Sequence, residues 1–108
     1  MDKSLETLRQ MVIDFSKRRD WEKFHNPKNL SMALIAEAGE LIEHFQWMDA
    51  EASNHLSKSQ HQAVAMELAD ILIYLVRIAD RLDIDLIESG IFKMRINEQR
   101  FPVPDKRG

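Results

Sequence analysis

The sequence contains no cysteine, which excludes disulfide bonds, thiolate metal sites and cysteine nucleophiles. Glycine and proline occur three times each, and two of the prolines lie near the C-terminal end. No stretch shows the alternation of apolar and polar residues that is typical of β-strands. The longest apolar run, 71–76, is far too short to cross a membrane, and the first residues lack the apolar core of a signal peptide. These absences predict an all-α, cytoplasmic protein.

The charges are mixed in sign and sum to −3, which leaves no broad basic surface for a nucleic-acid polymer. The 108 residues contain no linker-like segment, so we expect a single domain over 1–108 with a disordered tail from about residue 104. A chain of this length buries only about two-thirds of its unfolded surface when alone. Part of the core is therefore expected to come from a second copy.

The hydrophobic pattern predicts four helices. The first covers about 5–19 with Ser4 as its N-cap, and the second covers about 29–47. After a polar, turn-like segment, the third covers about 60–82 with Ser57 or Ser59 as its cap. The fourth begins after Asp83 or Asp85 and ends at about residue 99.

Two pairs of acidic residues lie in otherwise apolar helical stretches: Glu37 with Glu40, and Glu67 with Asp70. Carboxylates three positions apart lie on one side of a helix, and their desolvation is costly unless a positive group compensates it. Hard oxygen ligands without Cys or His favour Mg²⁺, with Mn²⁺ as a substitute, over Zn²⁺. We therefore expect the four carboxylates to hold at least one divalent cation and to be catalytic.

The third helix also permits a different interpretation. Glu67 and Asp70 share a polar stripe with Tyr74, Arg77 and Arg81, so the carboxylates can pair with the arginines in a salt-bridge seam. The second acidic helix of matching spacing favours the metal site. A di-iron bundle needs Glu-x-x-His pairs on two helices, and neither acidic helix has one.

Aromatic residues suggest a flat ligand. Trp21 and His25 lie on the predicted loop between the first two helices, where Trp21 either seals the end of the bundle or lines a pocket. On the second helix, polar and aromatic residues share a sector of about 80° with the first acidic pair. This sector contains Asn29, His44 and Trp47. Whether Glu43 or His44 also reaches the metal stays open.

A cationic face on the fourth helix suggests a polyphosphate. Lys93, Asn97 and Arg100 are spaced for one helix face, and such groups bind phosphate oxygens well. The glycine-rich cradle of P-loop proteins is absent, so cations and side chains such as Tyr74 would neutralise the phosphates. Hydrolysis of a nucleotide polyphosphate is the reaction that these groups suggest together.

These motifs resemble those of the all-α nucleoside triphosphate pyrophosphohydrolases, the MazG-like superfamily. The resemblance rests on the ExxE and ExxD pairs and extends over about 5–103. The tryptophan loop, 19–25, and the segment Lys93-Met94 with Asn97 are closest to its dCTP pyrophosphatase branch. Ala36 stands before Glu37, as in that branch, where the wider superfamily often has a second Glu.

The resemblance implies a four-helix-bundle-like subunit completed by homo-oligomerisation, as a tetramer of two dimers rather than a single dimer. It implies Mg²⁺-dependent cleavage of a dNTP between the α and β phosphates, giving dNMP and pyrophosphate and cleaning the nucleotide pool. It places Mg²⁺ at the four carboxylates, phosphate or sugar at Tyr74, Lys93 and Asn97, and the base at Trp21, His25 and Trp47.

The base preference stays open at this point. The first helix presents Val12 and Phe15, which have no hydrogen-bonding groups, to the expected base pocket. Candidate substrates are dCTP, a modified cytosine nucleotide or a wider range. Two non-enzymatic alternatives are a nucleotide-binding module with little turnover and a purely structural helical oligomer.

Overall fold

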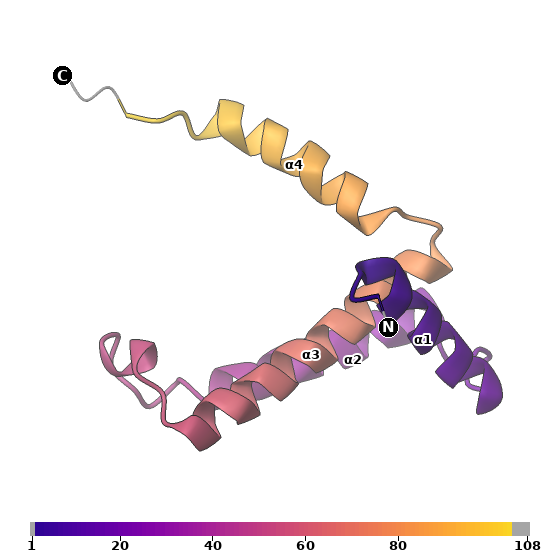
Figure 1. Ribbon diagram of the computed structural model, residues 1–108, viewed down its shortest axis with the longest axis horizontal. Helices are drawn as coiled ribbons and strands as arrows, with labels where there is room; N and C mark the ends of the chain where they lie inside the picture. Colours follow the sequence, from indigo (N-terminus) through magenta and orange to yellow (C-terminus); the bar gives the residue numbers. More distant parts are fainter. Residues whose placement is uncertain (1, 105–108) are drawn as a thin grey trace.

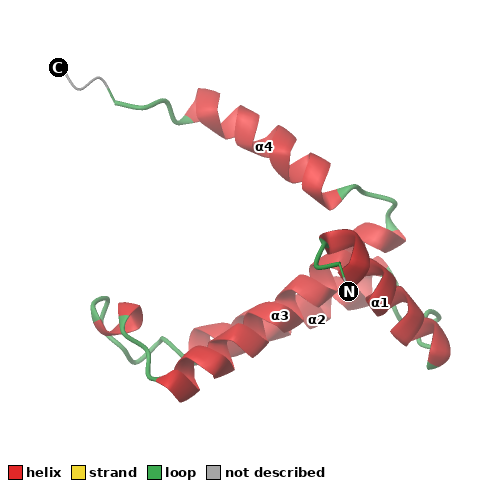
Figure 2. Cartoon of the chain, in the orientation of Figure 1, coloured by secondary structure: helices red, strands yellow, loops and turns green. Residues whose placement is uncertain are grey.

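The computed structural model describes residues 2–104, which contain only helices and connecting segments (Figures 1 and 2). The all-α prediction is therefore confirmed for this range. Residues 105–108 of the expected tail lie outside it. No helix in the described part is long and apolar enough to cross a membrane. The helices are α1 (Leu5–Arg18), α2 (Pro27–Glu43), the short 3₁₀ helix η1 (Ala52–Asn54), α3 (Lys58–Arg81) and α4 (Leu86–Arg100).

Three helices begin at residues that the sequence analysis considered as caps: Ser4 is the predicted cap, and the structure selects Ser57 over Ser59 and Asp85 over Asp83. The Ser4 side chain accepts a hydrogen bond from the backbone N–H of Thr7. The Ser57 hydroxyl accepts from the N–H of Gln60, whose side chain accepts from the N–H of Ser57 in turn. The Asp85 side chain caps α4 by accepting a hydrogen bond from the N–H of Glu88. These side chains satisfy backbone donors that have no partner within the helix.

Helix α2 is displaced from its predicted range at both ends. It begins at Pro27 because proline suits the first helical position, and Asn26 caps it by accepting from the N–H of Asn29. It ends at Glu43 because the chain then tightens into shorter turns. The prediction that the helix continues to Trp47 is wrong, and the Trp47 side chain is 89% exposed.

Helices α1 and α3 both end in a Schellman motif with aspartate in the left-handed conformation. The φ angles of Asp20 and Asp83 are 56° and 55°, a region that Asp tolerates better than most residues. After α1, the N–H of Asp20 donates to Lys17 O at 3.1 Å and that of Trp21 donates to Ser16 O at 3.0 Å. The chain therefore folds back and returns Trp21 to the side of α1.

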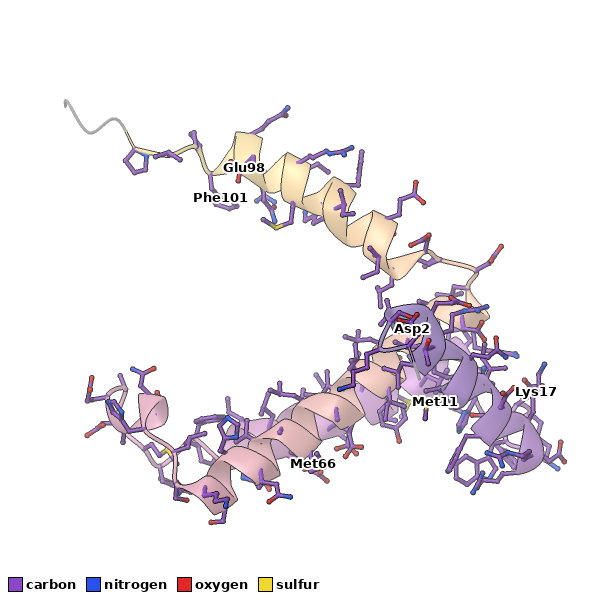
Figure 3. The ribbon with its side chains drawn as sticks, viewed as in Figure 1. Asp2, Met11, Lys17, Met66, Glu98 and Phe101 are labelled. Atoms are coloured by element: carbon purple, nitrogen blue, oxygen red, sulfur yellow. The ribbon has the colours of Figure 1, made fainter. Side chains whose placement is uncertain are left out.

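Within one chain, α1, α2 and α3 pack together into a body. Helices α2 and α3 pack along each other, and α1 packs against α3 (Figure 1). The buried apolar side chains are Ile13, Leu30, Val76 and Ala79. Figure 3 shows Met11 on α1 within this body, whereas Glu98 lies on α4 and Phe101 directly follows it, on an arm that extends away from the body.

Helix α4 contains no buried residue, so one chain by itself does not close a four-helix bundle. The radius of gyration is 17.6 Å, compared with about 13 Å for a compact domain of this length. The accessible surface is 8823 Å², compared with about 6,200 Å² for a compact monomer of this mass. Exposed apolar side chains along α4 contribute to this excess of surface: Ile87, Ile91, Phe92 and Met94.

Candidate active site

Packing of α2 against α3 brings three of the four predicted carboxylates together. Glu37, Glu67 and Asp70 each offer an oxygen, and the three oxygens lie within 4.8 Å of one another. Glu40 does not belong to this group, although its charge raises the pKa of both Glu37 and Glu67. Carboxylate oxygens at such spacing can share one divalent cation.

The carboxylates are unfavourably placed without a positive group between them. The pKa of Glu37 is raised to about 7, first because protonated Glu37 can hydrogen-bond to Glu67, and then by burial and the nearby Glu40. Burial also raises the pKa of Glu67. One oxygen of each of these two glutamates, Oε2, is buried without a hydrogen-bond partner. A divalent cation would relieve both the repulsion and the missing partners, so these residues fit one.

The salt-bridge seam considered for α3 does not form. Arg77 instead pairs with Asp80, its Nη1 lying 3.0 Å from Oδ2, and with Glu22. Among the described residues, neither Glu67 nor Asp70 forms an ion pair with Arg77 or Arg81. The carboxylate cluster is therefore left without an internal cationic partner in this part of the chain.

A cavity of about 430 Å³ adjoins the carboxylates, between α1, the 19–26 loop, α2 and α3. Its lining includes three predicted substrate-binding residues, Trp21, His25 and Tyr74, together with Glu37 and Asp70 of the cluster. Apolar side chains from α1 form the opposite wall, Val12 and Phe15 among them. The volume is typical of a small-molecule pocket, and the lining suits a flat, partly polar ligand.

The loop holds its aromatic residues by local bonds. The returning chain places the Trp21 ring edge-on to the Phe15 ring, with the ring centroids 5.5 Å apart. The Trp21 ring also contacts the His25 ring, and these centroids are 5.6 Å apart. Asn29 Nδ2 donates to Phe24 O at 3.0 Å and so fastens the end of the loop to α2. Asn29, predicted to bind substrate, is therefore engaged with the loop backbone and does not line the cavity.

The surroundings of His25 favour its neutral form. Burial lowers its pKa, and the positive charges of Arg77 and Arg81 lower it further. Its Nδ1 atom is buried without a hydrogen-bond partner. A neutral imidazole has one donor and one acceptor nitrogen, so His25 can hydrogen-bond to the edge of a neutral ligand.

Four other predicted substrate-binding residues lie away from this cavity within one chain. Trp47 follows α2, and the remaining three lie on the extended α4. None of them lines the cavity, and their roles stay predictions. They are Trp47, Lys93, Asn97 and Arg100. Conversely, Arg77 does line the cavity. Its place on the polar stripe with Asp70 and Tyr74 was visible in the sequence, where it was considered only as part of the alternative salt-bridge seam.

The all-α fold and the acidic site beside a cavity define the class of protein: this chain belongs to the MazG-like family, whose family model matches residues 33–108. Among individual proteins, it is 46% identical over 107 residues to dCTP pyrophosphatase 1 of Rattus norvegicus, covering 97% of this chain. It is 45% identical over 101 residues to dCTP pyrophosphatase 1 of Homo sapiens, covering 92% of this chain. The predicted family is confirmed.

The chain spans 63% and 59% of the lengths of those two relatives. The fold is also similar to the crystal structure of a pyrophosphatase from Archaeoglobus fulgidus, with a TM-score of 0.87 and 34% identity. That similarity covers 95% of this chain and 96% of the archaeal chain. It therefore includes α4, the helix that lies apart from the rest.

Proposed function

We propose that this protein is a Mg²⁺-dependent nucleoside triphosphate pyrophosphohydrolase whose substrate is dCTP or a modified cytosine dNTP. The observation that carries the proposal is the sharing of Glu37 and Asp70 between the carboxylate cluster and the 430 Å³ cavity. A nucleotide whose base occupies the cavity has its phosphates beside the carboxylates. The names of the relatives, dCTP pyrophosphatase and pyrophosphatase, support the same reaction.

In the proposed reaction, a water oxygen bonds to the α-phosphorus, the α–β phosphoanhydride bond breaks, and pyrophosphate leaves. Bound Mg²⁺ would neutralise phosphate charge and lower the pKa of water. Glu37, Glu67 and Asp70 would hold the cation. Glu40, one helical turn from Glu37, completes the acidic set and is available to accept the proton of the attacking water.

We further propose that the active protein is a homo-oligomer, a tetramer of two dimers, in which α4 serves a neighbouring copy. The surface of one chain exceeds that of a compact monomer by roughly 2,600 Å², an area in the range of obligate interfaces. Docking of α4 on another copy would bury its apolar residues and bring Lys93, Asn97 and Arg100 toward phosphates. The substrate belongs to the nucleotide pool, so we propose the cytoplasm as the place of action.

A turnover panel tests the proposal. Purified protein with Mg²⁺ is given the four common dNTPs, dUTP and 5-methyl-dCTP, and pyrophosphate and orthophosphate are measured separately. We expect pyrophosphate release, greatest on cytosine nucleotides and abolished in Glu40→Ala and Asp70→Ala. The exposed Glu51→Ala serves as the matched control. Orthophosphate release would contradict the α–β cleavage, and Mg²⁺-dependent binding without turnover would favour the binding module.

A further inference from the structure

Arg77 is among the most deeply buried side chains of the described chain, with 2% of its surface exposed. It lines the same cavity as Trp21, His25 and Asp70. Seven positions separate it from Asp70 on α3, which corresponds to about 10 Å along the helix. With phosphates held at Asp70, Arg77 therefore lies toward the end of the cavity that a base would occupy.

A chain of ion pairs fixes the Arg77 guanidinium. Arg9 of α1 donates from Nη2 to Asp80 Oδ1 at 2.8 Å, and Arg77 donates from Nη1 to Asp80 Oδ2 at 3.0 Å. Asp80 is thus held by two arginines and holds one edge of Arg77 in place. A guanidinium fixed in this way loses little further freedom when it binds a ligand.

The other edge of Arg77 has no hydrogen-bond partner. Nε and Nη2 are both buried without a hydrogen-bond partner. The ion pair of Nη2 with Glu22 Oε1 is 3.7 Å long, too far for a hydrogen bond. These two nitrogens form one fork of parallel N–H groups, which matches two neighbouring acceptors. Unsatisfied buried donors are costly, so a ligand that supplies both acceptors gains affinity at this position.

Among the bases, cytosine offers N3 and O2 as neighbouring acceptors on its pairing edge. Uracil and thymine have a protonated N3 between their carbonyls, and adenine alternates donor and acceptor on the corresponding edge. Guanine offers O6 and N7 on its other edge, which arginine also binds. The similarity to dCTP pyrophosphatases favours cytosine over guanine.

We propose that Arg77 is a specificity-determining residue that donates from Nε and Nη2 to N3 and O2 of a cytosine base. This proposal rests on the proposed function and deepens it. Neither the family motifs nor the carboxylate cluster includes Arg77. Its free fork also supplies the hydrogen-bonding groups that Val12 and Phe15, on the α1 wall of the cavity, do not have.

The test compares dCTP with dUTP, which differ at the 4-position and in the protonation of N3. In Arg77→Lys, which keeps the charge but loses the fork, the ratio of kcat/KM for dCTP to that for dUTP should fall about 10- to 100-fold. Most of the fall should come from dCTP. Arg77→Gln should give the same direction, and the exposed Arg18→Lys, a matched change of side chain, should leave the ratio unchanged.

Product binding provides a second measurement that needs no turnover. Titration of dCMP and dUMP into each variant with Mg²⁺ should show dCMP losing its advantage in Arg77→Lys. Equal losses for both bases, or an unchanged ratio in an active variant, would overturn the role of Arg77 alone. A wild-type preference for dGTP would also overturn the cytosine assignment. A wild-type protein that neither binds nor hydrolyses any nucleotide would overturn the proposed function as well.

Discussion

The body formed by α1, α2 and α3 differs sharply from the arm formed by α4. The body contains the buried core, the three-carboxylate group and the adjoining cavity. The arm has apolar and cationic residues but buries none of them within its own chain. Helix α3 of the body and helix α4 of the arm both have capped N-termini, so the local sequence favours helix formation equally in the two regions.

The difference shows that the predicted site divides between the two regions. Apart from Trp47, the groups expected to hold the cation and the base lie on the body or on the loop between α1 and α2. Most groups expected to bind phosphate lie on the arm. Under our proposal, a single chain therefore presents only half of a phosphate site, and a neighbouring copy supplies the other half. The predictions below test this division, beginning with the largest expected effect.

Removing one carboxylate of the three-carboxylate group should nearly abolish turnover. In Glu67→Gln we expect turnover to fall at least about 100-fold, because charge stabilisation at the phosphates is lost. The rise in Tm on adding Mg²⁺ should disappear as well. Initial rates and thermal melts with and without Mg²⁺ measure both effects, with Glu51→Gln as the control. Activity within tenfold of the wild type would contradict the role of Glu67 in holding a catalytic cation.

Placing a charge on the apolar face of the arm should separate the copies. Ile91 is 51% exposed in one chain, and Ile91→Glu would bury a carboxylate if α4 docks on a partner. We expect a smaller particle by sedimentation and turnover about 100-fold lower, since the phosphate-binding groups are misplaced. Glu98→Gln on the same helix should change neither. An unchanged mass for Ile91→Glu would contradict docking through this face.

Lys93 on the arm should act on the site of another copy. We expect Lys93→Ala to reduce kcat/KM about 10- to 100-fold through loss of a charged hydrogen bond to phosphate. Co-expression of Lys93→Ala with Glu67→Gln should restore part of the activity, because mixed oligomers contain some sites with both halves intact. Lys58→Ala is the control. Mixed oligomers that remain as inactive as either variant would show that each chain completes its own site.

The smallest effect concerns stability without metal. The folded-state pKa of Glu37 is about 7, above its ordinary value of 4.5. Its contribution to stability is therefore present at low pH and lost as the pH rises through about 7. In EDTA, the Tm of the wild type should fall relative to Glu37→Gln between about pH 5 and pH 8. Saturating Mg²⁺ should reverse the trend, because ligands bind the cation in their deprotonated form. If Tm changed with pH in EDTA equally for the wild type and Glu37→Gln, the raised pKa of Glu37 would be contradicted.

Local features of the fold followed from the sequence. The caps at Ser4, Ser57 and Asp85 depend only on residues within one helical turn. Ser4 was predicted outright, and Ser57 and Asp85 were each one of two predicted candidates. The acidic pairs were equally visible, because their spacing and apolar surroundings are local properties. The family model then confirmed the resemblance that these motifs suggested.

Features that depend on packing between helices could not be predicted from the sequence. Arg77 is held through Asp80, which also accepts a hydrogen bond from Arg9 of α1, 71 positions away from Asp80 in the sequence. The end of α2 before Trp47 depends on the turn that leads to η1, and the apolar pattern continues past it. The separation of α4 is invisible to periodicity, because an amphipathic face looks the same whichever chain covers it.

One wall of the cavity comes from α1, which packs against α3 and contributes none of the clustered carboxylates. Side chains such as Val12 and Phe15 can change on that helix while the acidic helices stay as they are. Under the proposed function, the α1 wall of the base pocket therefore lies on a different helix from the residues that would hold the cation. If that function is correct, substitutions on α1 alone could change which base is accepted while the carboxylates that hold the cation stay the same.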